Sequence, residues 1–186
     1  LSIDENRELL KQGRVIILLD KEQLVYSVGA PEKDESYYVI YRDTKNFFYE
    51  RKIPDVEITD TYKGIQISIQ DIKFVADSSE ILPEEKERID AIYEELYKIT
   101  KDNEFTIMVE GHTDSTGTIE VNKPLSQSRA DTVLQYCISA DSGLSATEIA
   151  AIKTLLAAAG YASERLVLNA DGTENTDASR RVGFRF

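Results

Sequence analysis

The sequence predicts an α+β fold, a two-layer sandwich in which helices cover one face of a β-sheet, preceded by a small β-rich region. From about residue 61, short apolar runs typical of strands alternate with longer segments whose apolar residues recur at helical spacing. Residues 1–60 are instead rich in β-forming residues separated by polar turns. The later elements follow the order β-α-β-α-α-β-β, which suits a sheet with its helices on one side.

Residues 1–60 are predicted to form an antiparallel meander or small sheet. The polar residues 20–22 indicate a hairpin connection, and residues 9–13 indicate a short helix that Gly13 ends. The dense Tyr and Phe residues between 37 and 49 are more typical of core and cross-strand pairs than of a ligand platform. We assign this region no function. Its predicted strands are VIILLD, QLVYSVG, SYYVIYRD and FFYERKI.

The predicted main domain, residues 61–186, begins with a half-buried strand over 65–74, where apolar and polar residues alternate. Pro83 then opens a helix, because proline is favoured at the first helical position and the glutamates after it suit the positive end of the helix dipole. Apolar residues recur at helical spacing as far as Ile99. A second strand over 105–109 ends at Gly111.

The second half of this domain is predicted to contain two more helices and two more strands. One helix begins at about Ser126, and a third helical stretch over 146–159 ends at Gly160. The runs 165–168 and 182–186 supply the last strands. The apolar stripe of the helix that begins near Ser126 consists of Ala130, Val133, Leu134, Cys137 and Ile138.

Charge and composition exclude several functions. A net charge of −12 opposes non-specific binding to nucleic acid, which needs Lys and Arg for the phosphates, and opposes adhesion to an anionic membrane. With one Cys and one His, the chain offers no thiolate cluster and no zinc site, so neither a metal nor a cofactor is expected. Cys137 lies on an apolar stripe and is expected in the core.

The hydropathy pattern predicts no membrane helix. No apolar run approaches the roughly 18 residues that such a helix needs. The chain opens on Leu1 without a basic start, as expected of a processed form or an excised piece. Membrane contact is therefore expected only through a segment absent from this chain.

A loop between a strand and a helix carries the residues best suited to binding. Gly111 and Gly117 bracket a tight turn, and Asp114 lies between them. Ser126 is a natural N-cap, which places Arg129 at the third helical position, where a cation opposes the helix dipole. Two explanations fit this spacing equally. Asp114 and Arg129 form a structural ion pair, or Arg129 binds an external carboxylate while Asp114 holds an external ammonium, which together recognise a zwitterion.

The segments GHTDSTG and NKPLSQSRADTV resemble the core signature of the OmpA-like peptidoglycan-binding family, the C-terminal domain type of OmpA, MotB and Pal. The resemblance extends from about Ile65 to Phe186 and includes FVADSSEIL and SRRVGFRF. It implies a βαβαββ sandwich that binds peptidoglycan non-covalently, through the diamino acid of the stem peptide. Diaminopimelate is one such diamino acid.

The resemblance also assigns roles to residues. It implies that Asp114 takes the ligand ammonium and Arg129 its carboxylate. Asn122 supports the loop or touches the ligand, Thr113 lines the pocket, and Arg180 lies at the pocket edge. The sequence departs from the family pattern in having Ser179 in place of an Asn, Val75 in place of a frequent Asp, an altered stretch over 169–174, and an extra helix within 140–160.

The function expected on this basis is that of a non-enzymatic anchor, which ties an envelope protein to the cell wall in the periplasm, in association with the outer membrane or cell envelope. A lipoprotein, an outer-membrane barrel or a motor-associated stator fits equally as the whole protein. An enzyme is not expected, because the sequence offers no nucleophile with a base and no convincing carboxylate pair, and the family keeps His112 without chemistry. The alternative is a protein-protein interaction module of the envelope with a structural Asp114–Arg129 pair. The N-terminal region is a second possible surface for an envelope partner.

Overall fold

The computed structural model describes residues 16–20, 23–27, 33, 35–61, 63–70, 72–74, 79–102, 105–139 and 141–186. The chain divides into two compact units, residues 1–39 and 40–186. In the first unit, β1 (Ile16–Asp20) pairs with β2 (Gln23–Ser27) in an antiparallel hairpin, which confirms the connection predicted at residues 20–22. The helix predicted over residues 9–13 lies outside the described residues.

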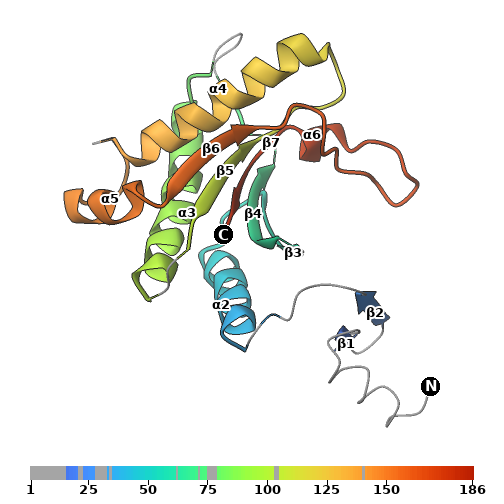
Figure 1. Cartoon of the computed structure of the whole chain (residues 1–186), viewed down its shortest axis with the longest axis horizontal. Coiled ribbons are helices and arrows are strands. Elements are labelled where there is room, and N and C mark those ends of the chain that lie inside the picture. Colours follow the sequence, from blue (N-terminus) through green and yellow to red (C-terminus); the bar gives the residue numbers. More distant parts are fainter. Residues whose placement is uncertain are drawn as a thin grey trace. The chain divides into compact units, whose positions relative to one another are not determined.

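The second unit is built on a five-stranded sheet with the strand order β3-β4-β7-β5-β6 (Figure 1). β5 and β6 are parallel, and the other neighbouring strands are antiparallel. The mixed α+β sandwich is confirmed. The predicted β-α-β-α-α-β-β order holds as far as α5, but the last elements are β6, the short helix α6 and β7, and β6 does not lie at the predicted residues 165–168. Helices α3 and α4 lie along the sheet. The elements are α2 (Glu35–Arg51), β3 (Val56–Thr61), β4 (Gly64–Gln70), α3 (Pro83–Asp102), β5 (Ile107–Gly111), α4 (Ile119–Cys137), α5 (Ala146–Lys153), β6 (Leu156–Gly160), α6 (Thr176–Ser179) and β7 (Arg181–Arg185).

The core lies between the sheet and the helices α3 and α4. Alternation along β4 buries Ile65, Ile67 and Ile69, while α3 presents a stripe of apolar residues that face them. Tyr93 of α3 meets Phe184 of β7 edge to face, with ring centroids 5.4 Å apart. Cys137 is fully buried, as its place on the apolar stripe predicts. Among the described helices, none is long and apolar enough to cross a membrane.

The strands predicted within residues 36–53 are wrong, because the structure has a helix, α2, over most of this stretch. Aromatic and β-branched residues favour strands only weakly, and packing decides the outcome. The buried residues of α2 are Thr44 and Phe48, which lie one helical turn apart. Phe48 joins the core of the second unit. Strand β3 follows α2 and was not predicted as a separate element. The domain boundary placed at residue 61 stays a prediction.

The predicted start of α4 at Ser126 is also wrong. The helix begins at Ile119, with Thr118 as its N-cap, and Pro124 lies inside it. Proline removes one backbone hydrogen bond, and the packing of α4 on the sheet offsets that loss. Ser126 is fully buried in the middle of the helix. Its Oγ donates to Lys123 O at 3.0 Å and accepts from the N–H of Ala162 at 2.9 Å, so it fastens α4 to the segment after β6.

The predicted helix over 146–159 is right only as far as Lys153, and the run LAAAG forms strand β6. Alanine has a high helix propensity, but here its small side chain lets α4 pack closely on the strand. A Cβ at Gly160 would lie 2.6 Å from Gln127 Cα, and Gly160 N–H donates to Gln127 Oε1 at 2.8 Å. The strand predicted over 165–168 is reduced to one bridge between Leu168 and Glu174.

Gly160→Ala is expected to lower the free energy of unfolding by about 2–3 kcal/mol, because the new methyl group would overlap the backbone of α4. Urea unfolding followed by circular dichroism measures this. Gly172→Ala is the matched control: no atom lies within 4 Å of its Cβ position, and only the left-handed φ of +82° opposes it, at about 1 kcal/mol. An equal loss in both variants would contradict the close packing of α4 on β6.

Candidate functional site

Asp114 occupies the loop that follows β5, and its carboxylate is held on both oxygens. Oδ1 accepts from the backbone N–H of Thr116 at 2.8 Å, and Oδ2 lies 3.2 Å from Nη1 of Arg180. The side chain is 13% exposed. Burial raises the pKa of Asp114, but the hydrogen bonds from Thr116 and Arg180 outweigh it and the pKa is lowered. Asp114 is therefore an anion held at fixed geometry with part of its surface open.

The loop around Asp114 is fixed from several sides. The N–H of Thr113 donates to Ala162 O at 2.9 Å, and its hydroxyl donates to Asp114 O at 3.0 Å. Asn122 of α4 donates through Nδ2 to Thr116 O at 2.8 Å. Glu174 accepts from both the backbone N–H and the hydroxyl of Ser115. Thr113 and Asn122 therefore support the loop, and their predicted contacts with a ligand stay predictions.

Arg129 lies in the middle of α4, so the helix dipole does not explain it and that part of the sequence argument is wrong. Its guanidinium carbon lies 4.8 Å from the ring centroid of Phe74, a cation-π contact. Its Nε is buried, and within the described part of the chain it has no hydrogen-bond partner. Burial and the nearby Arg180 lower the pKa of Arg129, while Asp114 opposes this. Arg129 is a half-buried cation close enough to Asp114 for their charges to interact.

Asp114 and Arg129 form no ion pair among the described residues, so the structural pair that the sequence allowed is not made. The partner of Asp114 is Arg180, which follows α6 immediately before β7. Arg180 also binds Asp177 through Nη2. Arg180 thus bridges two carboxylates. The sequence placed Arg180 at the edge of the site but did not foresee Asp177, Glu174 or Phe74, because these contacts depend on how distant loops meet.

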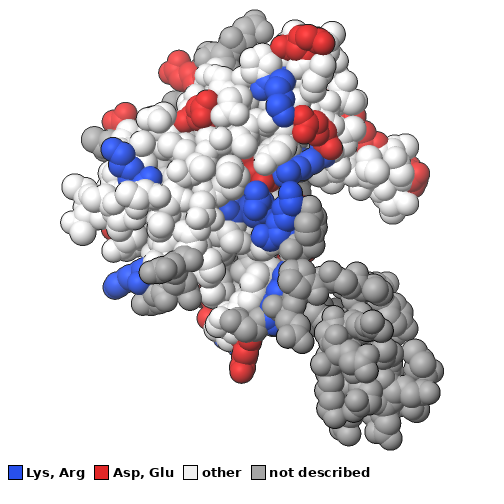
Figure 2. All heavy atoms as spheres, viewed as in Figure 1, with Lys and Arg blue, Asp and Glu red and all other residues white. Residues whose placement is uncertain are grey.

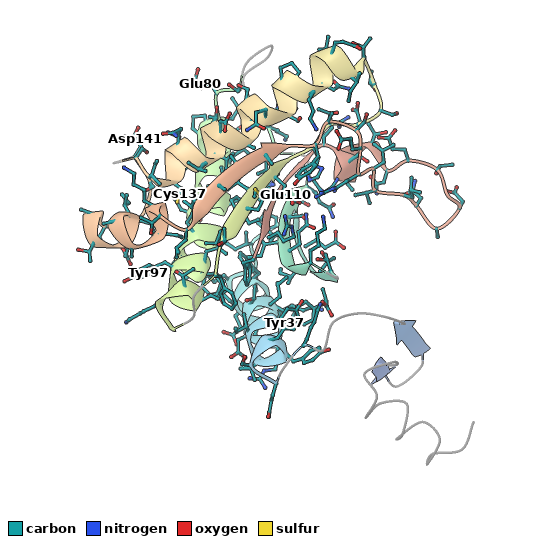
Figure 3. The ribbon with its side chains drawn as sticks, in the orientation of Figure 1. Tyr37, Glu80, Tyr97, Glu110, Cys137 and Asp141 are labelled. Carbon is teal, nitrogen blue, oxygen red and sulfur yellow. The ribbon has the colours of Figure 1, made fainter. Side chains whose placement is uncertain are left out.

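An ion cluster lies on the sheet beside this loop, around Glu110 of β5 (Figure 3). The Glu110 side chain is 1% exposed. Both of its oxygens lie 3.1 Å from Nη1 of Arg165, and Oε1 lies 2.9 Å from both Nε and Nη2 of Arg185. Burial raises the pKa of Glu110, but the nearby His112 and the hydrogen bonds and positive charges of Arg185 and Arg165 outweigh this and lower it to about 2. The sequence analysis missed this cluster, although the spacing of Arg181 and Arg185 puts both on one face of β7.

His112 is fully buried next to Glu110 and stacks on Tyr161, with ring centroids 5.6 Å apart. Its Nε2 lies 3.8 Å from Glu110 Oε2, which is beyond hydrogen-bonding distance. Burial lowers the pKa of His112. A neutral, enclosed ring is in keeping with the structural role expected of this residue. Among the described residues, no group of three or more His, Cys, Asp and Glu side chains is placed to hold a metal.

Comparison with known proteins gives the family. A model of the OmpA family matches residues 73–182, which include α3, β5, the Asp114 loop, α4, α5 and β6.

The chain belongs to the OmpA family.

Over 142 residues the chain is 32% identical to the Zorya protein ZorB of Escherichia coli, a match that covers 70% of this chain and 60% of that protein. The chain therefore spans about 60% of the length of this curated relative. Solved structures share the fold. A MotB-like protein from Desulfovibrio vulgaris aligns with a TM-score of 0.57 and 18% identity over 81% of this chain and 90% of its own. The cell wall anchor of the T6SS from Pseudomonas aeruginosa aligns with a TM-score of 0.52 and 20% identity, over 75% and 92%.

The Glu110 cluster predicts how stability depends on acid. A carboxyl with a folded pKa of about 2, against an ordinary value of 4.5, adds about 2–3 kcal/mol to the free energy of unfolding above pH 4.5. This contribution is lost as the pH falls from 4.5 to 2. Glu110→Gln is therefore expected to be less stable than the natural protein at pH 7, with a gap that narrows below pH 4.5. Urea unfolding at pH 7 and pH 3 measures the gap, and an unchanged gap would contradict this account.

Proposed function

We propose that the chain binds peptidoglycan non-covalently and anchors an envelope protein to the cell wall. The ligand is the free amino-acid centre of the stem-peptide diamino acid, and Arg129 and Asp114 hold its two charges. The observation that carries this proposal is the Arg129 guanidinium, a half-buried cation whose Nε has no acceptor among the described residues. A buried donor without a partner costs free energy, and a ligand carboxylate would satisfy it.

The rest of the site suits a ligand that carries both charges. Asp114 stays ionised because its pKa is lowered, so it can accept a ligand ammonium. A carboxylate has about four acceptor positions, and Thr116 and Arg180 occupy one on each oxygen. An ammonium on the open side of Asp114 and a carboxylate on Arg129 describe an α-amino acid centre. Phe74 holds the Arg129 guanidinium from one side, which limits the directions from which a carboxylate can approach.

Two carboxylates, Asp114 and Asp177, and two guanidinium groups, Arg129 and Arg180, lie in or beside the site. Charges of both signs therefore surround the site, as a zwitterionic ligand requires. Asp114 would repel a ligand that carries only a carboxylate, and Arg129 would repel a ligand that carries only an amine. The charge arrangement therefore favours a ligand in which both groups are present on one carbon.

Affinity for a single amino-acid centre is expected to be modest, since it rests on a few charge-assisted contacts in a partly open site. Peptidoglycan presents many copies of the ligand on one polymer, so several domains held on one complex reinforce one another.

Membership of the OmpA family supports this function. So does the fold shared with the cell wall anchor of a secretion system. We place the domain in the periplasm, where peptidoglycan is found.

Asp114→Asn and Arg129→Gln are each expected to weaken binding to purified sacculi by at least about tenfold, because each removes one charge-assisted contact. Pelleting of the protein with sacculi measures the affinity. Binding by the natural protein is also expected to fall as salt rises, since the contacts are ionic.

Glu50→Gln and Arg42→Gln are the matched controls, because they make the same changes at exposed side chains outside the site. Both are expected to bind as the natural protein does. Unchanged pelleting of an Asp114→Asn, Arg129→Gln double variant would overturn the proposed site. Failure of the natural protein to pellet would instead favour a protein-protein interaction module, and release of soluble muropeptides would favour an enzyme.

A further inference from the structure

Three arginines gather on the face of the sheet that we call the outer face, defined by Arg181 and Arg185 of β7. Val182 and Phe184 point into the core, so the alternation of the strand sends their neighbours to the opposite side. Gly183 lies between the two arginines and pairs in register with Glu110 of β5. Glu110 therefore lies on the same face.

Arg165 completes the cluster from the segment after β6. Its guanidinium carbon lies 3.5 Å from the ring centroid of Tyr161, and its backbone oxygen accepts from Nη2 of Arg181 at 3.0 Å. The side chains of Arg165 and Arg185 are 35% and 21% exposed. Both therefore lie at the surface with their positions fixed by neighbours, as in a preorganised binding site.

The cluster places three guanidinium groups around one buried acid. Glu110 is the acid that Arg165 and Arg185 both contact. Burial lowers the pKa of Arg181, and the nearby Arg165 lowers it further, against the effects of Glu110 and Glu57. A single arginine is enough to neutralise a buried glutamate, so the remaining guanidinium groups are not needed for that.

Basic side chains form a visible patch here. Figure 2 shows Lys and Arg side chains gathered over the position that β7 takes in Figure 1. Some guanidinium donors of the patch remain available. Arg165 contacts Glu110 through Nη1 alone, and Arg185 does so through Nε and Nη2. Among the described residues, Nη1 of Arg185 has no hydrogen-bond partner. Guanidinium groups with donors to spare bind carboxylates and phosphates through paired hydrogen bonds.

We propose that Arg165, Arg181 and Arg185 form a second anion-binding site on the outer face, which takes a carboxylate of the same wall polymer that the Asp114 site binds. This identification of the polymer rests on the proposed function, whereas the oxyanion chemistry of the site does not. Stem peptides carry further carboxylates besides the amino-acid centre. Two contacts on one strand raise the effective affinity without a new partner.

The location of the site favours the wall polymer over a lipid surface. Arg180 and Arg181 are consecutive, and the first contacts Asp114 while the second belongs to the outer-face cluster. The two sites therefore meet at the same end of β7, within reach of one strand of polymer. An anionic membrane would have to approach the whole acidic chain, which its net charge of −12 opposes.

The first test uses the natural 186-residue chain and glutarate, a simple dicarboxylate, as the probe. The arginine Nε–H signals are followed by NMR during a titration with glutarate. The signals of Arg165, Arg181 and Arg185 are expected to shift saturably. The same shifts are expected in the Asp114→Asn, Arg129→Gln double variant, whose first site is removed. Absence of a saturable shift in the natural chain would overturn the second site, whether or not the Asp114 site binds its ligand.

The second test identifies the polymer. Arg165→Gln leaves Glu110 paired with Arg185 and is expected to weaken sacculus binding three- to tenfold, while affinity for free diaminopimelate stays within twofold. Arg42→Gln, which removes the same charge from an exposed position on α2, is the control and is expected to bind normally. Equal binding by the two variants would overturn the proposal. The proposal would also be overturned if vesicles containing phosphatidylglycerol bound the natural chain and did not bind the Arg165→Gln variant.

Discussion

The close approach of α4 to strands β5 and β6 is the constraint on which the site depends. Glycines make the approach possible, since a Cβ at Gly111 would lie 2.9 Å from the carbonyl carbon of Ser126. Ser126 then fastens the helix to the segment after β6 through its buried hydroxyl. With α4 held at this distance, Asn122 reaches the loop after β5 and Arg129 comes to lie beside Asp114. Packing of the backbone therefore sets the position of the charges.

The two charges differ in how completely the protein itself satisfies them. Asp114 receives a backbone N–H and the guanidinium of Arg180, which keeps it ionised and oriented. Arg129 receives only the ring face of Phe74 among the described residues. In the proposed function, this fixed but open anion and a cation whose Nε has no acceptor among the described residues together receive a dipolar ligand. The β7 arginines lie on the other face of the sheet.

The sequence predicted the mixed α+β sandwich and the start of α3, because Pro83 and the glutamates after it act locally. It failed where packing overrides propensity. Residues 35–51 form a helix despite their aromatic and β-branched content, although Tyr41, Thr44 and Phe48 recur at helical spacing. The LAAAG run forms a strand because small side chains are needed under α4. Arg129 was selected by a helix-end argument that the structure contradicts, and Asp177 and Phe74 were not foreseen because only the folded chain brings them to the site.

The most direct test of the account is titration of the natural chain with free meso-diaminopimelate, followed by NMR of the Nε–H signal of Arg129. The account predicts a saturable shift of that signal, because the ligand carboxylate supplies an acceptor for Arg129 Nε, which has none among the described residues. It also predicts that a diamine without carboxylates, such as cadaverine, leaves the signal unchanged. An Arg129 signal that ignores diaminopimelate at saturating concentration would contradict the claim that the Asp114 and Arg129 pair receives an amino-acid centre.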